Sequence, residues 1–247
     1  MKLLLNILFF ILLSAFFSVN VKAKESLTIV AGFNKPPYVI KTEDTISGFE
    51  VDLIDMVLEQ MGYHSNLILV PFGRSMKLLD EPGIDGILTA SPKLFTDPSK
   101  LTKPYVVYQN AAISLKKSNI QVDNILQLQA YSMASFQMAS KLLGNEFATA
   151  TEISPYFVEV TQQERQLKLL AKEKVQLLIM DVNIFNHFNK NTNLEVKTHP
   201  IFPKSAYVMA FANSEIVEPF NQAMQAFKAS NAYRELLIKH GVPPPQI

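Results

Sequence analysis

The sequence predicts an α/β protein, because apolar runs of strand length alternate along the chain with segments of helical period. The strand-length runs cover residues 27–31, 67–70, 84–88 and 175–180. Continuous apolar runs of this kind are typical of strands that are covered on both faces in a parallel sheet. No internal repeat, low-complexity tract or Pro/Ser-rich linker divides the chain.

The predicted helices are marked mainly at their N-terminal ends. Ser47 and Glu50 have the spacing of a capping box, and Gly62 marks the C-terminal end of the same helix. The apolar face of this helix comprises Leu53, Ile54, Val57, Leu58 and Met61. A second capping box, Thr161 with Glu164, predicts a helix that runs to about residue 172.

If the chain forms two lobes, ordered segments must join them. Residues 105–115 and 196–207 are rich in β-forming residues and lie where the chain would leave one lobe and later return. Residues 219–239 are predicted to form a helix that packs back on the first lobe. The prolines at 243–245 end this helix.

Residues 1–23 have the pattern of a cleavable export signal. Lys2 precedes a nearly unbroken apolar run over residues 3–17, and the small residues at 21 and 23 predict cleavage after Ala23. The alternative is a membrane anchor, but the run has about 15 residues against the ~20 that span a bilayer. We expect the mature chain to be free in the periplasm.

The composition argues against several classes of function. Loss of Lys2 and Lys22 with the signal changes the formal net charge from +1 to −1. The mature chain therefore lacks the net positive charge that attracts nucleic acid. Cysteine is absent, which excludes thiolate nucleophiles and cysteine metal sites. The histidines lack ligand spacing, and motifs of hydrolases, zinc proteases and nucleotide-binding loops are missing. We therefore expect no cofactor, no metal and no catalysis.

The residues that follow the predicted strands are the candidate ligand contacts, because ligands of open α/β sheets bind outside the carboxyl ends of the strands. These ends carry aromatic, hydroxyl, guanidinium and carboxylate groups, which suit a small zwitterion or polar organic molecule. The residues are Tyr38, Phe72, Arg74, Thr89, Ser91 and Asp181.

Each of these residues also has a structural alternative. Asp181 can cap the N-terminus of the helix that follows it, and this role is compatible with ligand contact. A surface salt bridge is the ordinary fate of Arg74, although its guanidinium fork suits a carboxylate. Tyr38 and Phe72 can be packing residues, and the hydroxyl residues can bond loop backbone groups.

Several short segments occur in an order that is more specific than any one of them. They are Pro36-Pro37-Tyr38, Gly48 to Leu53, Phe72, Asp85-Gly86-Ile87, Lys103-Pro104-Tyr105, Gln176 to Asp181 and Tyr207 to Asn213. Over nearly all of residues 25–241, the chain in this way resembles the extracellular solute-binding proteins of the polar-amino-acid type, which serve ABC transporters. The resemblance implies a two-lobed periplasmic binding protein fold, with two hinge strands and a ligand cleft between the lobes. Lobe 1 would comprise residues 24–110 and 203–247, and lobe 2 residues 111–202.

The resemblance also implies roles for residues that match the family's pattern. Asp181 matches the acid that receives the ligand's ammonium group, Phe72 an aromatic ligand contact, and Thr89 a donor in the first-lobe loop. The family's Thr-x-x-Arg, which binds the ligand's carboxylate, has no counterpart, because residues 91–97 contain no arginine. This departure puts an ordinary α-amino acid ligand in question.

A second departure concerns the predicted second lobe, where the family has a glycine turn and this chain has Phe136. Its neighbours Ser135 and Gln137 are further candidate contacts. We hypothesise that Arg74, and secondarily Arg165 near a helix start, takes over the binding of an anionic group.

The function predicted from these features is periplasmic capture of a small polar or anionic, amino-acid-like solute for an ABC transporter. We expect a monomer whose partners are the ligand and an inner-membrane permease or sensor protein. One alternative is a ligand-sensing module of the same fold. The other is an enzyme similar to cyclohexadienyl dehydratase, which shares the fold.

Overall fold

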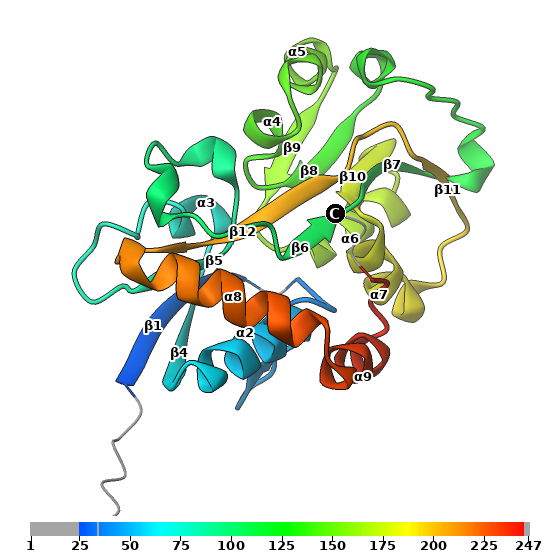
Figure 1. The fold of residues 1–247 in the computed structure, drawn as a ribbon. Coiled ribbons are helices and arrows are strands. Elements are labelled where there is room, and N and C mark those ends of the chain that lie inside the picture. The colour runs from blue at the N-terminus through cyan, green and yellow to red at the C-terminus, as the bar shows by residue number, and fades with distance from the viewer. Residues whose placement is uncertain (1–24, 34, 245–247) are drawn as a thin grey trace, which may run out of the picture.

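The computed structural model describes residues 25–33 and 35–244, whose strands form two five-stranded sheets and a small hairpin. The predicted α/β class is confirmed (Figure 1). The predicted export signal, residues 1–23, lies outside the described residues. Across the described ranges no helix combines the length and apolar character needed to cross a membrane.

The first sheet has the strand order β4-β1-β5-β12-β6. Its strands are β1 (Glu25–Gly32), β4 (Tyr63–Val70), β5 (Gly86–Ala90), β6 (Val106–Tyr108) and β12 (Ser205–Phe211). β1 runs parallel to β4 and β5, whereas β12 is antiparallel to β5 and β6. Around this sheet lie α2 (Phe49–Gln60), α3 (Phe72–Ser75), α8 (Val217–Lys228) and α9 (Asn231–His240) (Figure 1). Buried apolar side chains cover both faces of β1 and β5, as the continuous apolar runs predict, whereas Ile68 of the edge strand β4 is 41% exposed.

The second sheet has the order β11-β7-β10-β8-β9. Its strands are β7 (Asn110–Leu115), β8 (Met133–Phe136), β9 (Phe157–Val160), β10 (Leu177–Asp181) and β11 (Val196–His199). Around it lie α4 (Ala139–Leu142), α5 (Asn145–Ile153), α6 (Glu164–Ala171) and α7 (Val182–Thr192). The hairpin is β2 (Ile40–Lys41) with β3 (Ile46–Ser47). Short 3-10 helices are η2 (Pro92–Leu94), η3 (Pro98–Lys100), η4 (Lys116–Ser118), η5 (Ile125–Ala130) and η6 (Ser214–Ile216).

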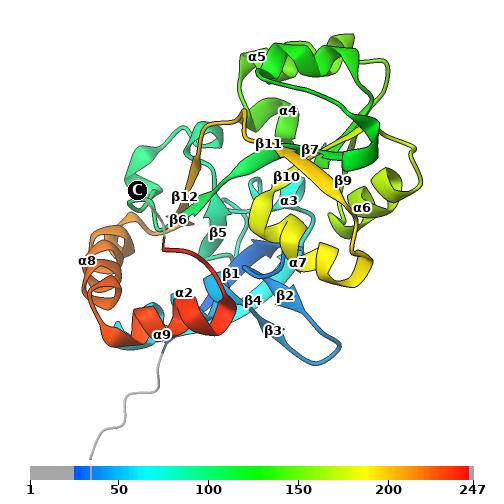
Figure 2. The same ribbon diagram turned by 90° about the vertical axis from the view of Figure 1, so that its right-hand side faces the viewer.

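The chain passes between the sheets in two places. It leaves the first sheet after β6 and enters the second at β7, and it returns between β11 and β12 (Figure 2). Both passages fall within the extended segments that the sequence indicates. The lobe boundaries near residues 110 and 202 stay a prediction.

The capping box expected at the first helix is wrong. α2 has Gly48 as its N-cap residue and no side-chain capping bond. Glu50 points into the core, where hydroxyl groups from Tyr105 and Tyr108 donate to its carboxylate. Burial among these donors outweighs the local bond to Ser47 that the spacing suggests.

The second capping box is also wrong, although the helix itself ends near the expected residue. α6 has Gln163 at its N-cap, again without a side-chain bond. Glu164 instead pairs with Lys168, one turn further along, at 2.9 Å. Thr161 lies three residues before the helix and lines a pocket between the two sheets.

The single C-terminal helix predicted over residues 219–239 is two helices. α8 ends at Lys228, and the Ser230 hydroxyl accepts the backbone N–H of Tyr233 at 3.2 Å to begin α9. A serine oxygen that bonds a nearby N–H competes with continued helix and favours a new start. Asp52 of α2 then holds the end of α9 through Lys239.

Gly48 is required where the chain enters α2. Its φ of 119° lies in a region that side chains disfavour, and a Cβ there would stand 2.5 Å from the carbonyl oxygen of Tyr38. We expect Gly48→Ala to lower the free energy of unfolding by about 3 kcal/mol, since strain alone costs of order 1–3 kcal/mol and the backbone must also move. Urea unfolding followed by circular dichroism measures this.

Gly62→Ala is the matched control for this prediction. Gly62 also has a positive φ, of 86°, but no atom lies within 4 Å of a Cβ built there. Only the conformational strain should appear, so the loss should be clearly smaller. Equal losses for the two variants would contradict the steric explanation.

Candidate ligand-binding site

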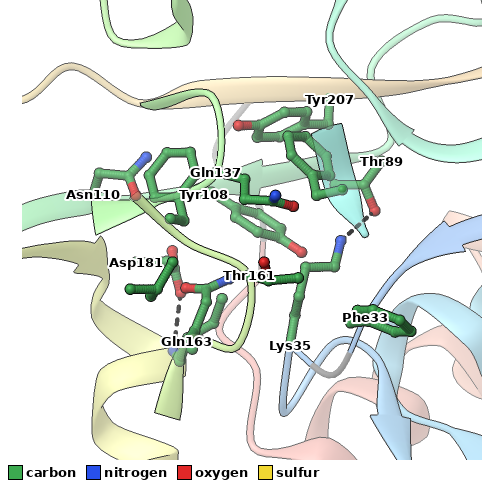
Figure 3. Close-up of a pocket in the computed structure, with 14 residues that line it drawn as sticks. Phe33, Lys35, Thr89, Tyr108, Asn110, Gln137, Thr161, Gln163, Asp181 and Tyr207 are labelled. Carbon is green, nitrogen blue, oxygen red and sulfur yellow. Dashed lines mark hydrogen bonds between the residues drawn. The ribbon is translucent and has the colours of Figure 1, made fainter. Parts of the chain in front are cut away.

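A pocket lies between the two sheets (Figure 3). It is lined by Phe33, Lys35, Phe72, Thr89, Tyr108, Asn110, Phe136, Gln137, Val160, Thr161, Gln163, Asp181, Ile184 and Tyr207. Many of these residues stand at or just beyond the carboxyl ends of strands, as expected for an open α/β sheet.

Asp181 ends β10 and is 1% exposed. One carboxylate oxygen accepts the N–H groups of Asn183 and Ile184 at 2.9 and 3.1 Å, and the other accepts that of Gln109 at 2.8 Å. The residue therefore caps α7, as the sequence allows, and also faces the pocket. Burial raises the pKa of Asp181 to about 6, although the backbone N–H groups act in the opposite direction.

Lys35 brings a buried ammonium group into the same pocket and is 5% exposed. Its backbone exchanges hydrogen bonds with Val39 at 2.7 and 3.1 Å, which fixes the loop after β1. Its Nζ donates to Thr89 Oγ1 at 2.8 Å and lies 5.9 and 5.6 Å from the ring centres of Phe72 and Tyr108. Burial lowers the pKa of Lys35, while Glu50 and then Asp181 raise it.

Glu50 lies beneath this lysine and is fully buried. Its Oε2 accepts from Thr89 Oγ1 at 2.7 Å and from the Tyr105 hydroxyl at 2.5 Å, and its Oε1 accepts from the Tyr108 hydroxyl at 2.5 Å. Burial, and secondly the Glu50 charge, raises the pKa of both tyrosines well above the usual value, so they stay protonated donors.

Polar atoms without a partner also face the pocket. Among the described residues, the buried Asn110 Nδ2 and Gln163 Oε1 make no hydrogen bond. Such groups are rare in folded proteins, and these two are available to a molecule bound in the pocket. Asn110, Gln163 and Asp181 gather on one side of the pocket, and Lys35 points to Thr89 on the other (Figure 3).

The family model of the bacterial extracellular solute-binding proteins, family 3, matches residues 27–242, nearly the whole described chain. The chain belongs to this family. The resemblance noted from the sequence is thereby confirmed. A search of curated proteins finds no significant match.

Solved structures share the two-lobed fold at low identity. An ancestral arginine-binding protein bound to arginine is 19% identical with a TM-score of 0.74, and the match covers 88% of this chain and 99% of that chain. A Streptococcus pneumoniae ABC uptake transporter substrate-binding protein with bound histidine is 17% identical with a TM-score of 0.72, and the match covers 87% of this chain and 92% of that chain. A histidine kinase sensor domain with similarity to periplasmic binding proteins is 15% identical with a TM-score of 0.77, and the match covers 90% of this chain and 99% of that chain. These likenesses establish the fold.

In this family 3 protein, four of the predicted contact residues line the pocket. They are Phe72, Thr89, Gln137 and Asp181. Tyr38 lies behind the lining, fully buried, with its ring stacked on that of Tyr108 at 4.3 Å between centres. Phe136, where the family has a glycine turn, contributes to the apolar wall.

The other predicted contacts lie elsewhere. Ser91 is buried beside a separate pocket, and Ser135 is buried with its hydroxyl donating to the carbonyl of Phe136. Arg74 and Arg165 are both exposed, and neither lines the pocket between the sheets. The two arginines expected to bind an anion are therefore not brought together with Asp181.

Direct contacts join the two lobes around the pocket. Asn183 Nδ2 donates to the Tyr38 hydroxyl at 2.8 Å, and the Gly73 N–H donates to Gln137 Oε1 at 3.3 Å. At another edge, Lys93 Nζ donates to the carbonyl of Leu142 at 2.8 Å. Within residues 25–33 and 35–244, no cluster of His, Asp or Glu side chains has the geometry of a metal site.

Sequence reasoning missed Lys35, Asn110 and Gln163. Lysine is rarely buried, so its position before two prolines is unremarkable in the sequence. Asn110 lies inside a segment that was assigned only a connecting role. The available signal was positional, since Lys35 follows β1 and Gln163 follows β9, as other lining residues follow their strands.

Proposed function

We propose that this protein binds a small, amino-acid-like solute between its lobes and delivers it to the inner-membrane permease of an ABC transporter. The observation that carries the proposal is the presence of buried Lys35 and buried Asp181 in one pocket. Buried charges are costly unless they are paired. A zwitterionic ligand supplies both partners, and burial between the lobes strengthens each pairing.

The lobes are proposed to open and close about the segments that join β6 to β7 and β11 to β12. The contacts between Tyr38 and Asn183 and between Gly73 and Gln137 join the two lobes, so they would form on closure. We further propose a periplasmic location, which the family and the export pattern of residues 1–23 support. Binding is proposed to occur without turnover, so prephenate and arogenate should remain unchanged in its presence.

A solute screen on the mature protein tests the proposal. The panel contains the common L-amino acids, small carboxylic acids and simple amines. A ligand at 100 times its dissociation constant should add about 2.7 kcal/mol of stability. For a protein of this size that raises Tm by roughly 5–10 °C.

Amines without an acid group serve as the internal control and should give no shift. A flat response to all classes would contradict solute binding. Binding without any effect of gene deletion on cellular uptake of the same solute would contradict the transport role.

A second candidate is a ligand-sensing module. The similarity to a histidine kinase sensor domain, at a TM-score of 0.77, supports this sensing function. Neighbouring permease and ATPase genes would favour transport, and a neighbouring kinase gene would favour sensing.

A further inference from the structure

The ammonium group of Lys35 is incompletely used by the protein. It carries three N–H donors, and within the described residues its only hydrogen bond goes to Thr89 Oγ1. The group is nearly inaccessible to water, because Lys35 is 5% exposed. Its remaining donors therefore require an acceptor inside the pocket.

Glu50 does not supply that acceptor directly. Its oxygens are occupied by hydroxyl groups from Thr89, Tyr105 and Tyr108. The Thr89 hydroxyl stands between the two charges, since it accepts from Lys35 and donates to Glu50. The carboxylate thus holds the lysine in place through the threonine, and the lysine keeps donors available to the pocket.

The position of Lys35 is fixed from several sides. The backbone bonds to Val39 hold its loop, and the rings of Phe72 and Tyr108 lie beside the ammonium group. Figure 3 shows the Lys35 side chain lying within the pocket with its end directed at Thr89. A side chain held in this way loses little entropy when it binds a ligand.

We propose that Lys35 binds the carboxylate of the ligand, in the role that the missing Thr-x-x-Arg arginine would have filled. This assignment rests on the proposed function, because it names the residue and the ligand chemistry of the same pocket. Arg74 and Arg165, the candidates from the sequence, are exposed and outside the lining.

The walls of the pocket indicate the rest of the ligand. Phe33, Phe136, Val160 and Ile184 present apolar surface. Among the described lining residues, Asp181 is the sole carboxylate, and the ligand's amino group would use it. A positively charged side chain would find no second acid. The ligand class is therefore an amino acid with an uncharged side chain.

Paired acids and amides test the role of Lys35. The probes are L-alanine, L-valine, L-leucine, L-isoleucine, L-methionine and L-phenylalanine, each with its carboxamide, titrated calorimetrically into the wild-type protein and Lys35→Met. The wild-type protein should bind at least one acid about 10–100-fold more tightly than its amide, the range for a hydrogen bond to a charged group. Lys35→Met should lose most of this preference while its affinity for the amide changes less than about threefold.

Two further variants control for misfolding and for effects of removing a lysine that do not involve the pocket. Lys35→Gln removes the charge but keeps a donor for Thr89, and it should behave as Lys35→Met does. Lys117→Met removes an exposed lysine that pairs with Glu173 on the second lobe, and it should bind as the wild type does. Circular dichroism and Tm establish that each variant is folded.

The outcomes separate the two proposals. Equal weakening of acid and amide in the Lys35 variants, or no preference in the wild type, overturns the assignment and leaves solute binding intact. Lost acid affinity in Arg74→Ala with none in Lys35→Met overturns it in favour of Arg74. Tight binding of arginine or glutamate in place of the apolar series overturns the ligand class. No binding of any solute overturns the proposed function itself.

Discussion

Glu50→Leu is expected to lower the free energy of unfolding by about 3–5 kcal/mol, the cost of removing one partner of a buried charge pair. The substitution removes the carboxylate that Lys35 reaches through Thr89, and it leaves the hydroxyls of Tyr105 and Tyr108 without their acceptor. Leucine has a similar volume, so the loss reports the electrostatic change more than a cavity. Urea unfolding followed by circular dichroism measures it.

The controls for Glu50→Leu come from the same network and the same helix. Glu59→Leu replaces an exposed glutamate of α2 and should change stability by less than about 0.5 kcal/mol. The double variant Lys35→Met/Glu50→Leu should recover part of the loss, because no unpaired charge remains. A loss below about 1 kcal/mol for Glu50→Leu would contradict the coupling between Glu50 and Lys35.

Asp181→Asn is expected to weaken binding of the tightest amino acid by about 10–100-fold, as loss of a charge-assisted hydrogen bond does. Asparagine can still accept the N–H groups of Asn183 and Ile184, so the cap of α7 survives. Asp181→Ala removes both the charge and the cap, so it should cost about 1 kcal/mol more stability. Calorimetric titration and urea unfolding provide the two measurements.

The matched ligand for this prediction is the same acid without its amino group, such as 3-phenylpropionate for L-phenylalanine. It has no ammonium group to pair with Asp181, so Asp181→Asn should not weaken it. An equal loss for both ligands would mean that the substitution acts through pocket shape.

The pH dependence of ligand binding is a second test of the role of Asp181. Burial raises its pKa from 3.8 to about 6 in the ligand-free protein, and the ligand's ammonium favours the ionised form. Below about pH 6 the free protein therefore holds more protons than the complex, so affinity falls as pH decreases, by up to about tenfold per pH unit. Asp181→Asn should show no such fall between about pH 7 and 5.

The Asp181 contribution to the stability of the ligand-free protein should increase as pH decreases, whereas ligand affinity should fall. Because the folded pKa of Asp181 exceeds its unfolded value of 3.8, the folded state binds the proton more tightly. This contribution to stability is present at low pH and is lost as pH rises through about 6. Ligand-free and ligand-bound melting curves at several pH values distinguish the two effects.

The polar site was predicted in part because some of its residues follow strands. Phe72, Thr89 and Asp181 stand at or just beyond the carboxyl ends of strands, and the rule for open sheets places such residues at one edge. The roles of Glu50 and Lys35 were not predictable in this way. Glu50 has the spacing of a capping residue, and only its tertiary partners show otherwise.

The sequence by itself determined the α/β class, the approximate positions of four strands along the chain and the family, because apolar period and segment order are local properties that do not depend on tertiary contacts. Tertiary structure alone decided which charges meet. Tyr105 and Tyr108 lie 55 and 58 residues beyond Glu50, and Thr89 lies 54 beyond Lys35. Burial and pairing across such separations depend on how the strands assemble, and they turn an ordinary lysine into the proposed partner of a ligand's carboxylate.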